Sequence, residues 1–140
     1  MTYYDTTFHN SEVHAGRPVP NPKNATPLYL VDDMASAQRR FGVMGFEVTA
    51  CEEKGCISMK AGDSQVLLMD EAHAQRAMPP EVLTSFKHGP ALYVWVDSID
   101  ETRARISDPV IGEMVTGYGT WELFVESRIG LIIFAEKLLK

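Results

Sequence analysis

The chain has 140 residues, of which 45% are hydrophobic and 23% are charged, so it is too apolar for a disordered chain and long enough for one domain or two small modules. Its formal net charge of −6 argues against nucleic acid as a partner, because phosphate binding requires clustered Lys and Arg side chains. No apolar run is long enough to span a bilayer, and residues 1–20 lack the apolar segment of a signal peptide. We therefore expect a cytoplasmic protein with no membrane partner, in which Cys51 and Cys56 are free thiols.

Residues 1–25 form a polar segment that contains Pro18, Pro20 and Pro22. Proline has no backbone N–H to donate and fixes its own backbone angle, so this spacing disfavours regular secondary structure. We predict an extended N-terminal arm over residues 1–25. It either lies as a strap on the surface or is exchanged between two subunits.

Residues 26–71 are predicted to form a first module that consists of a strand, a helix and three more strands. Asp32 or Asp33 supplies the helix cap, since a short acidic side chain accepts hydrogen bonds from the first-turn N–H groups. Gly45 ends the helix. The predicted strands span residues 26–31, 46–51, 55–60 and 65–70, and the helix spans residues 34–43.

Residues 72–90 are predicted to be a linker, in which Pro79 and Pro80 precede a short helix over residues 81–87. Residues 91–140 are predicted to form a second module with the same order of elements. Ser98 and Glu101 have the spacing of a helix capping box. The predicted strands span residues 91–96, 110–115 and the two arms of a hairpin within residues 120–136, and a helix follows Ser98 and ends near residue 106.

The two modules are related by a fixed shift of 65 residues along the chain. With this shift, residues 28–34 fall on residues 93–99, and residues 55–71 fall on residues 120–136 without a gap. A constant offset indicates an internal repeat. The sequence therefore predicts an α+β fold, in which two tandem βαβββ modules form a curved mixed sheet around a concave cleft, with the helices on the outer face.

Three stretches resemble the vicinal oxygen chelate superfamily, which includes glyoxalase I, bleomycin resistance proteins, fosfomycin resistance enzymes and extradiol dioxygenases. They read PLYLVDDMASAQRRFGVMGFEV, ALYVWVDSIDETRARI and GYGTWELFVESRIGLIIFAE. The resemblance covers about residues 25–137. It departs from the usual pattern at residues 126–129, where Glu-Ser-Arg-Ile stands in place of Asp-Pro-Asp-Gly. It implies the duplicated fold, and it says little about chemistry because this fold supports many reactions.

The resemblance also implies where a metal ion would bind. Metal-dependent members of the superfamily place one ligand at the start of the first strand and one near the middle of the fourth strand of each copy. The matching positions here are Thr26, Leu68, Ala91 and Ile133. Aliphatic side chains have no donor atom, and a neutral hydroxyl is a poor substitute for imidazole or carboxylate. We therefore expect no metal and no cofactor, as in the bleomycin-resistance-like branch.

The cleft is expected to be aromatic. If Ala91 faces inward, the two-residue period of a strand places Tyr93 and Trp95 on the same face. A pairing of Leu123 with Ile133 would add Trp121 to this face. The predicted ligand-binding residues are Tyr93, Trp95, Trp121, Leu123, Ser58 and Lys60. The same alternation predicts that Glu122 points to the helix side, exposed at an edge. Aromatic residues on a sheet also occur in cores and subunit interfaces, so that alternative remains open.

Three functions follow from these patterns. The first is sequestration of a small aromatic or heteroaromatic molecule, of the antibiotic-resistance type, by a homodimer with a metal-free cleft. The second is a metal-dependent lyase, isomerase or dioxygenase of the same superfamily that uses non-standard ligands. The third is a non-catalytic dimeric interaction module whose cleft is filled by its own side chains.

Overall fold

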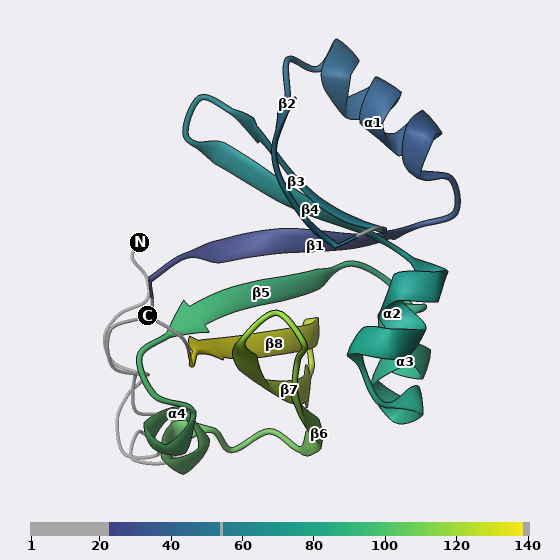
Figure 1. Cartoon of the computed structure of the whole chain (residues 1–140). Coiled ribbons are helices and arrows are strands. Elements are labelled where there is room, and N and C mark those ends of the chain that lie inside the picture. Colours follow the sequence, from purple (N-terminus) through teal and green to yellow (C-terminus); the bar gives the residue numbers. More distant parts are fainter. Residues whose placement is uncertain (1–22, 54, 139–140) are drawn as a thin grey trace, which may run out of the picture.

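The structure, a computed structural model, describes residues 23–53 and 55–138, so residues 1–22 of the predicted arm lie outside the described part of the chain. Its eight strands form one mixed sheet in the order β2-β3-β4-β1-β5-β8-β7-β6 (Figure 1). The elements, in chain order, are β1 (Ala25–Val31), α1 (Met34–Val43), β2 (Glu47–Glu53), β3 (Cys56–Ala61), β4 (Ser64–Asp70), α2 (Glu71–Ala77), α3 (Pro80–Phe86), β5 (Ala91–Val96), α4 (Ile99–Arg105), β6 (Val110–Val115), β7 (Thr120–Ser127) and β8 (Gly130–Lys137).

Each half of the sheet contains a parallel pair, a crossover helix and an antiparallel hairpin. In the first half β1 runs parallel to β4, and in the second half β5 runs parallel to β8. The two halves join because β1 pairs antiparallel with β5 within the same chain. The predicted α+β fold of two βαβββ units with a curved mixed sheet is confirmed.

Short polar side chains start the helices where the sequence predicts. Asp33 accepts a hydrogen bond from the backbone N–H of Ser36 at 3.2 Å, and Ser98 accepts one from the N–H of Glu101 at 3.1 Å. A helix over residues 71–77 was not predicted, yet Asp70 caps it by accepting from the N–H of His73 at 2.8 Å. Each cap satisfies a first-turn N–H group that has no partner within the helix.

Helices α1 and α4 cover the outer face of the sheet, one over each half. Side chains of α1, including Ala37 and Phe41, pack against buried residues of β3 and β4. Ile99 of α4 is fully buried against Val94 of β5 and Val125 of β7. The outer face of each half therefore has its own small hydrophobic core.

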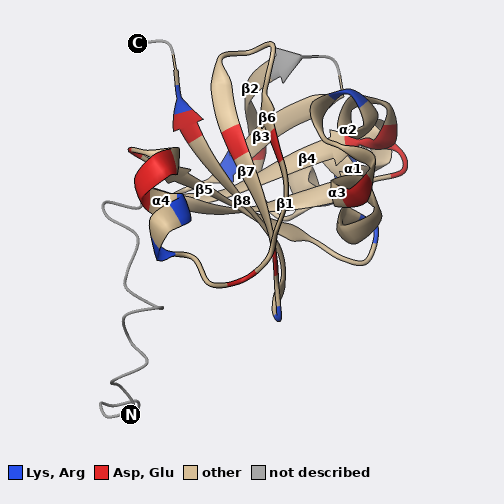
Figure 2. Cartoon of the chain, turned by 90° about the horizontal axis from the view of Figure 1, so that it is seen from below, with Lys and Arg blue, Asp and Glu red and all other residues tan. Residues whose placement is uncertain are grey.

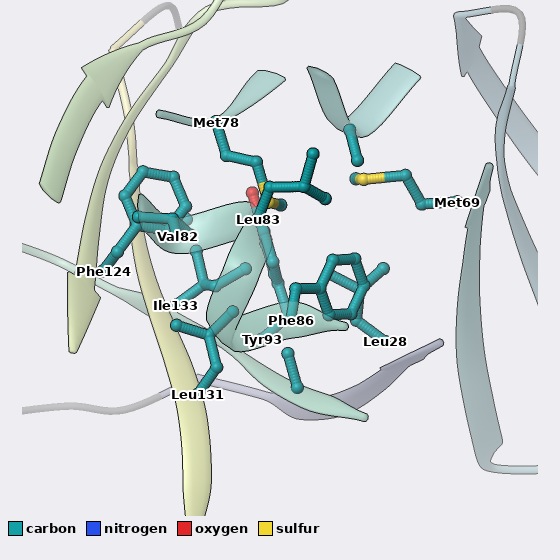
Figure 3. Close-up of a cluster of buried hydrophobic side chains, with 13 residues drawn as sticks. Leu28, Met69, Met78, Val82, Leu83, Phe86, Tyr93, Phe124, Leu131 and Ile133 are labelled. Atoms are coloured by element: carbon teal, nitrogen blue, oxygen red, sulfur yellow. The ribbon is translucent and has the colours of Figure 1, made fainter. Parts of the chain in front are cut away.

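Helices α2 and α3 lie against the inner face and fill one end of the space between the halves. Val82 and Phe86 of α3 are buried among side chains from both halves, including Leu28 of β1, Phe124 of β7 and Ile133 of β8 (Figure 3). The chain that joins the two repeats thus supplies part of the largest core.

The repeat offset changes by one residue between the first strands and the hairpins. Leu28 pairs with Leu67, and its counterpart Tyr93 pairs with Ile133. The first strands are thus 65 residues apart (28 and 93), whereas the fourth strands are 66 apart (67 and 133). A shift of one residue moves every side chain of a strand to the opposite face. The prediction of a gapless offset of 65 was wrong for the hairpins.

Charged side chains lie mainly on the helices and near the ends of strands, while most of the strand surface is uncharged (Figure 2). Across residues 23–53 and 55–138, every helix is too short or too polar to traverse a lipid bilayer.

A glycine on β6 allows α3 to approach the inner face, which leads to a test of the fold. A Cβ atom on Gly112 would lie 2.9 Å from Val82 Cγ2 and 3.1 Å from Pro79 Cγ. We expect Gly112→Ala to lower the free energy of unfolding by about 1–3 kcal/mol, because a packed core resists added volume. Urea denaturation measures this change. The matched control is Gly42→Ala on α1, where the added methyl group meets nothing within 4 Å and should not destabilise the fold. Equal effects of both substitutions would contradict the packing described for α3.

Candidate functional site

A cavity of about 310 Å³ lies on the inner face between the two halves of the sheet. Strands β1, β2, β3 and β4 of the first half and β5 of the second half contribute to its wall. The start of β7 with the turn before it, and Lys137 at the end of β8, complete it. It occupies the space that α2 and α3 leave unfilled, and its position between the halves depends on the pairing of β1 with β5.

The apolar part of the wall combines two aromatic rings with aliphatic side chains. Tyr93 and Trp95 of β5 both line the cavity, and their rings meet edge to face with centroids 5.5 Å apart. Leu28, Leu67 and Met69 line it from β1 and β4. Such a surface favours a planar apolar ligand, because aromatic pairs contribute about 0.5–1.5 kcal/mol beyond the burial of area.

A neutral polar group stands on the side formed by β2, β3 and β4. Gln65 Nε2 donates to Ser58 Oγ at 2.7 Å, and Thr49 Oγ1 donates to the same oxygen at 3.2 Å. All three residues line the cavity. They can donate and accept hydrogen bonds without carrying charge.

A buried carboxyl group lies behind the opposite wall. Glu122 of β7 is only 2% exposed, and its Oε2 accepts hydrogen bonds from Tyr93 Oη at 2.5 Å, Thr120 Oγ1 at 3.0 Å and Tyr118 Oη at 3.3 Å. All three donors line the cavity. The prediction that Glu122 would be exposed on the helix side was wrong, because the hairpin register differs by one residue from the one assumed.

Burial raises the pKa of the Glu122 carboxyl group, and the hydrogen bonds from Tyr93, Thr120 and Tyr118 partly oppose that rise. Burial and the neighbouring Glu122 likewise raise the pKa of the Tyr93 phenol well above its ordinary value. The phenol therefore keeps its proton and serves as a hydrogen-bonding group.

The predicted ligand-binding residues divide into two groups. Tyr93, Trp95 and Ser58 line the cavity, and their contact with a ligand stays a prediction. Lys60 is exposed and does not line the cavity. Trp121 and Leu123 were wrongly placed in the cleft, because they pack on the outer face beside α4.

The register of the last hairpin explains this correction. Leu123 pairs with Phe134, and Ile133 pairs instead with Phe124. Trp121 Nε1 donates to Glu113 Oε2 at 2.7 Å outside the cavity, and this bond lowers the pKa of Glu113. Leu68, which the resemblance matches to a metal-ligand position, packs in the cluster beneath α1.

Sequence analysis missed Tyr118, Thr120 and Glu122 as site residues. Residues 116–122 read TGYGTWE, in which a hydroxyl or carboxyl group recurs at every second position. Period-two spacing is the signature of one face of a strand. The signal was not used because the predicted hairpin began at residue 120, and Gly119, with a positive φ of 89°, interrupts the extended backbone just before it.

The inner-face positions do not provide the donor set that the metal-dependent members of this fold would use. The inner-face residues of the first and fourth strands are Thr26, Leu28, Leu30, Gln65, Leu67, Met69, Ala91, Tyr93, Trp95, Leu131, Ile133, Ala135 and Lys137. None of these side chains is an imidazole or a carboxylate. In the part of the chain that the structure describes, no group of three or more His, Cys, Asp or Glu residues is placed to hold a metal ion.

The strand order and the duplicated βαβββ unit define the vicinal oxygen chelate fold, which the resemblance in the sequence predicted. A crystal structure of a glyoxalase/bleomycin resistance protein/dioxygenase superfamily member from Vibrio splendidus 12B01 aligns with a TM-score of 0.60 at 16% identity. The alignment covers 81% of this chain and 98% of that one. A hypothetical protein from Bacillus halodurans C-125 aligns with a TM-score of 0.61 at 16% identity, over 84% of this chain and 98% of that chain.

A bleomycin-binding protein complexed with bleomycin aligns at 14% identity over 82% of this chain and 98% of that chain, but with a TM-score of only 0.34. No protein-family model and no curated protein sequence matches the chain. These likenesses therefore establish the fold and leave the ligand to be argued from the cavity itself.

The buried carboxyl group makes a prediction about stability and pH. Because the folded-state pKa of Glu122 is raised, the folded protein holds one proton more than the unfolded chain between the unfolded and folded pKa values. Its contribution to stability is therefore complete below the unfolded pKa and is lost as the pH rises. In wild type, the free energy of unfolding should therefore decrease by up to about 1.4 kcal/mol per pH unit above about pH 5. We expect this decrease to be absent in Glu122→Gln.

Urea denaturation of both proteins between about pH 5 and pH 8 measures this slope. The matched control is Glu113→Gln, because the hydrogen bond from Trp121 lowers the Glu113 pKa and confines its effect to more acidic pH. The same slope in wild type and Glu122→Gln would contradict the buried position of this carboxyl group.

Proposed function

We propose that the protein binds a small planar aromatic or heteroaromatic molecule in the cavity and sequesters it without turning it over. The observation that carries this proposal is the cavity of about 310 Å³ with Tyr93 and Trp95 in its wall and aliphatic side chains beside them. A concave, mainly apolar site with a few polar groups is the usual form of a small-molecule site.

The energetics of such a wall favour binding. Each Å² of apolar ligand surface removed from water contributes about 25 cal/mol. The polar groups at the two ends of the cavity, Ser58 with Gln65 and Tyr93 with Glu122, are already paired within the protein. They can fix the orientation of a ligand that brings complementary polar atoms.

Sequestration is favoured over metal-assisted turnover because the fourth-strand positions that would supply ligands carry Leu67, Met69 and Ile133. The alternative of an enzyme with non-standard metal ligands predicts stoichiometric zinc, manganese or iron in the purified protein. The alternative of a module filled by its own side chains is supported only where α3 packs on the inner face of the sheet. The cavity lies outside the core that α3 forms there. We propose also that the protein acts in the cytoplasm and that sequestration protects against a toxic compound.

The two tryptophans of the chain provide a test, because they lie on opposite faces of the sheet. Trp95 lines the cavity, whereas Trp121 packs on the outer face. We expect quinoline, acridine or phenazine derivatives to quench the emission of Trp121→Phe, in which Trp95 is the remaining tryptophan. The matched variant Trp95→Phe, which reports from Trp121, should not respond.

The measurement is a fluorescence titration corrected for absorption with a free tryptophan derivative. If no member of a broad panel of planar aromatics changes the emission of Trp121→Phe, the proposed function is wrong. Equal quenching in both variants would place the binding site elsewhere.

We also propose that the protein is a homodimer that pairs through the edge strand β6. An edge strand has unpaired backbone groups that can pair with another chain. Val115 on this strand is 64% exposed, and Val110 is also exposed. Analytical ultracentrifugation should give twice the chain mass of 15.6 kDa. Val115→Lys should produce monomers, while Ile129→Lys in the exposed β7–β8 turn should not. A monomeric wild-type protein would contradict this proposal.

A further inference from the structure

We propose that the side of the cavity formed by Tyr93, Tyr118 and Thr120 is a subsite for a cationic hydrogen-bond donor, such as an ammonium or amidinium group on the aromatic ligand. The inference rests on the proposed function and adds the chemical class of the ligand. Nothing in the sequence pattern assigned a role to this side, because Glu122 was expected to lie on the opposite face.

The first argument is the direction of the hydrogen bonds. A hydroxyl group has one proton to donate and two lone pairs that accept. Tyr93, Thr120 and Tyr118 each donate toward the same atom, Glu122 Oε2, at 2.5, 3.0 and 3.3 Å. With these protons directed at the carboxylate, the oxygens have only lone pairs to offer a ligand. The inner wall therefore accepts hydrogen bonds and rejects a ligand carbonyl, carboxylate or phosphate.

A second network behind the wall is compatible with this direction for Thr120. Thr116 Oγ1 lies 2.6 Å from Thr120 Oγ1 in a buried hydrogen bond, and the backbone N–H of Thr120 donates to Thr116 Oγ1 at 3.2 Å. If Thr116 gives its proton to Thr120, Thr120 gives its own to Glu122. The carboxylate thus organises the hydroxyl groups as a set of acceptors before any ligand arrives.

The second argument is charge. Glu122 is 2% exposed, so an ionised carboxylate there is only weakly screened by water. The hydrogen bonds that its carboxylate receives come from neutral hydroxyl groups. A ligand cation at the subsite would compensate the buried negative charge, and the electron-rich faces of Tyr93 and Trp95 would add cation–π attraction.

Other charged and titratable groups around the subsite differ from Glu122 in their position and contacts. His73 of α2 stacks on the Tyr118 ring with centroids 6.3 Å apart, behind the wall. Lys137 of β8 also lines the cavity, where it is the cross-strand partner of Thr120 and its side chain is exposed. Of these three groups, only the Glu122 carboxyl is hydrogen-bonded to the hydroxyl groups of the subsite.

The test uses three two-ring probes of matched shape: 2-methylnaphthalene, 2-(aminomethyl)naphthalene and 2-naphthoate. Isothermal titration calorimetry at pH 8 gives the ratio of the dissociation constants of the carboxylate and the amine. In wild type we expect the amine to bind at least about tenfold more tightly than the carboxylate, as charge-assisted hydrogen bonds allow. In Glu122→Gln the ratio should fall to near one, because the amide removes the charge and can itself donate to a hydroxyl.

The matched control is Glu113→Gln, which removes the same charge from the outer face and should leave the ratio unchanged. A second measurement needs no variant. In wild type the ratio should also fall as the pH is lowered from 8, because protonation of Glu122 releases a hydroxyl proton toward the cavity. This keeps the inference testable if Glu122→Gln does not fold.

The outcomes separate the two proposals. Failure of all three probes to bind would overturn the proposed function together with this inference. Binding of 2-methylnaphthalene with no preference between amine and carboxylate would overturn the inference alone. A preference for the amine that persists in Glu122→Gln, or that does not weaken as the pH is lowered, would also overturn it.

Discussion

The antiparallel pairing of β1 with β5 is the interaction on which the rest of the structure depends. It brings Thr26 opposite Tyr93 and Leu28 opposite Ala91, so the inner faces of two separate repeats become one surface. Neither half could enclose a cavity alone, since each would expose its inner face to water. Once the halves are joined, α2 and α3 cover one end of that surface and the cavity takes the other.

The buried carboxyl group is the clearest departure from a core built only for stability. Transferring a carboxylate out of water costs several kcal/mol in real proteins unless partners compensate it. Glu122 receives compensation from the hydroxyl groups of Tyr93, Thr120 and Tyr118, and an isosteric apolar residue would avoid the cost altogether. Polar groups placed at such expense next to a cavity are more consistent with recognition than with packing.

The sequence predicted the elements and the repeat well, and it placed Tyr93, Trp95 and Ser58 at the cavity wall. It failed on the faces of the hairpins. The fourth strands contain VLLM and LIIFA, and such continuous apolar runs read the same after a shift of one residue. With nothing to mark inside from outside, the offset of 65 found in the first strands was also applied to the hairpins, where the offset is 66. Trp121 and Leu123 were assigned inward, and Glu122 outward, because Leu123 was expected to pair with Ile133, which instead pairs with Phe124.

The path of the backbone beside the cavity has a practical consequence for experiments in which the protein is immobilised on a solid support. Trp95 exchanges backbone hydrogen bonds with Lys23 and Asn24, so the chain enters the described structure beside the cavity wall. Lys137 lines the cavity only a few residues before the other end of the chain. A sensor chip or resin that captures the protein through its C-terminal residues therefore holds the cavity close to the solid support. Attachment through the β7–β8 turn would present it to the solution.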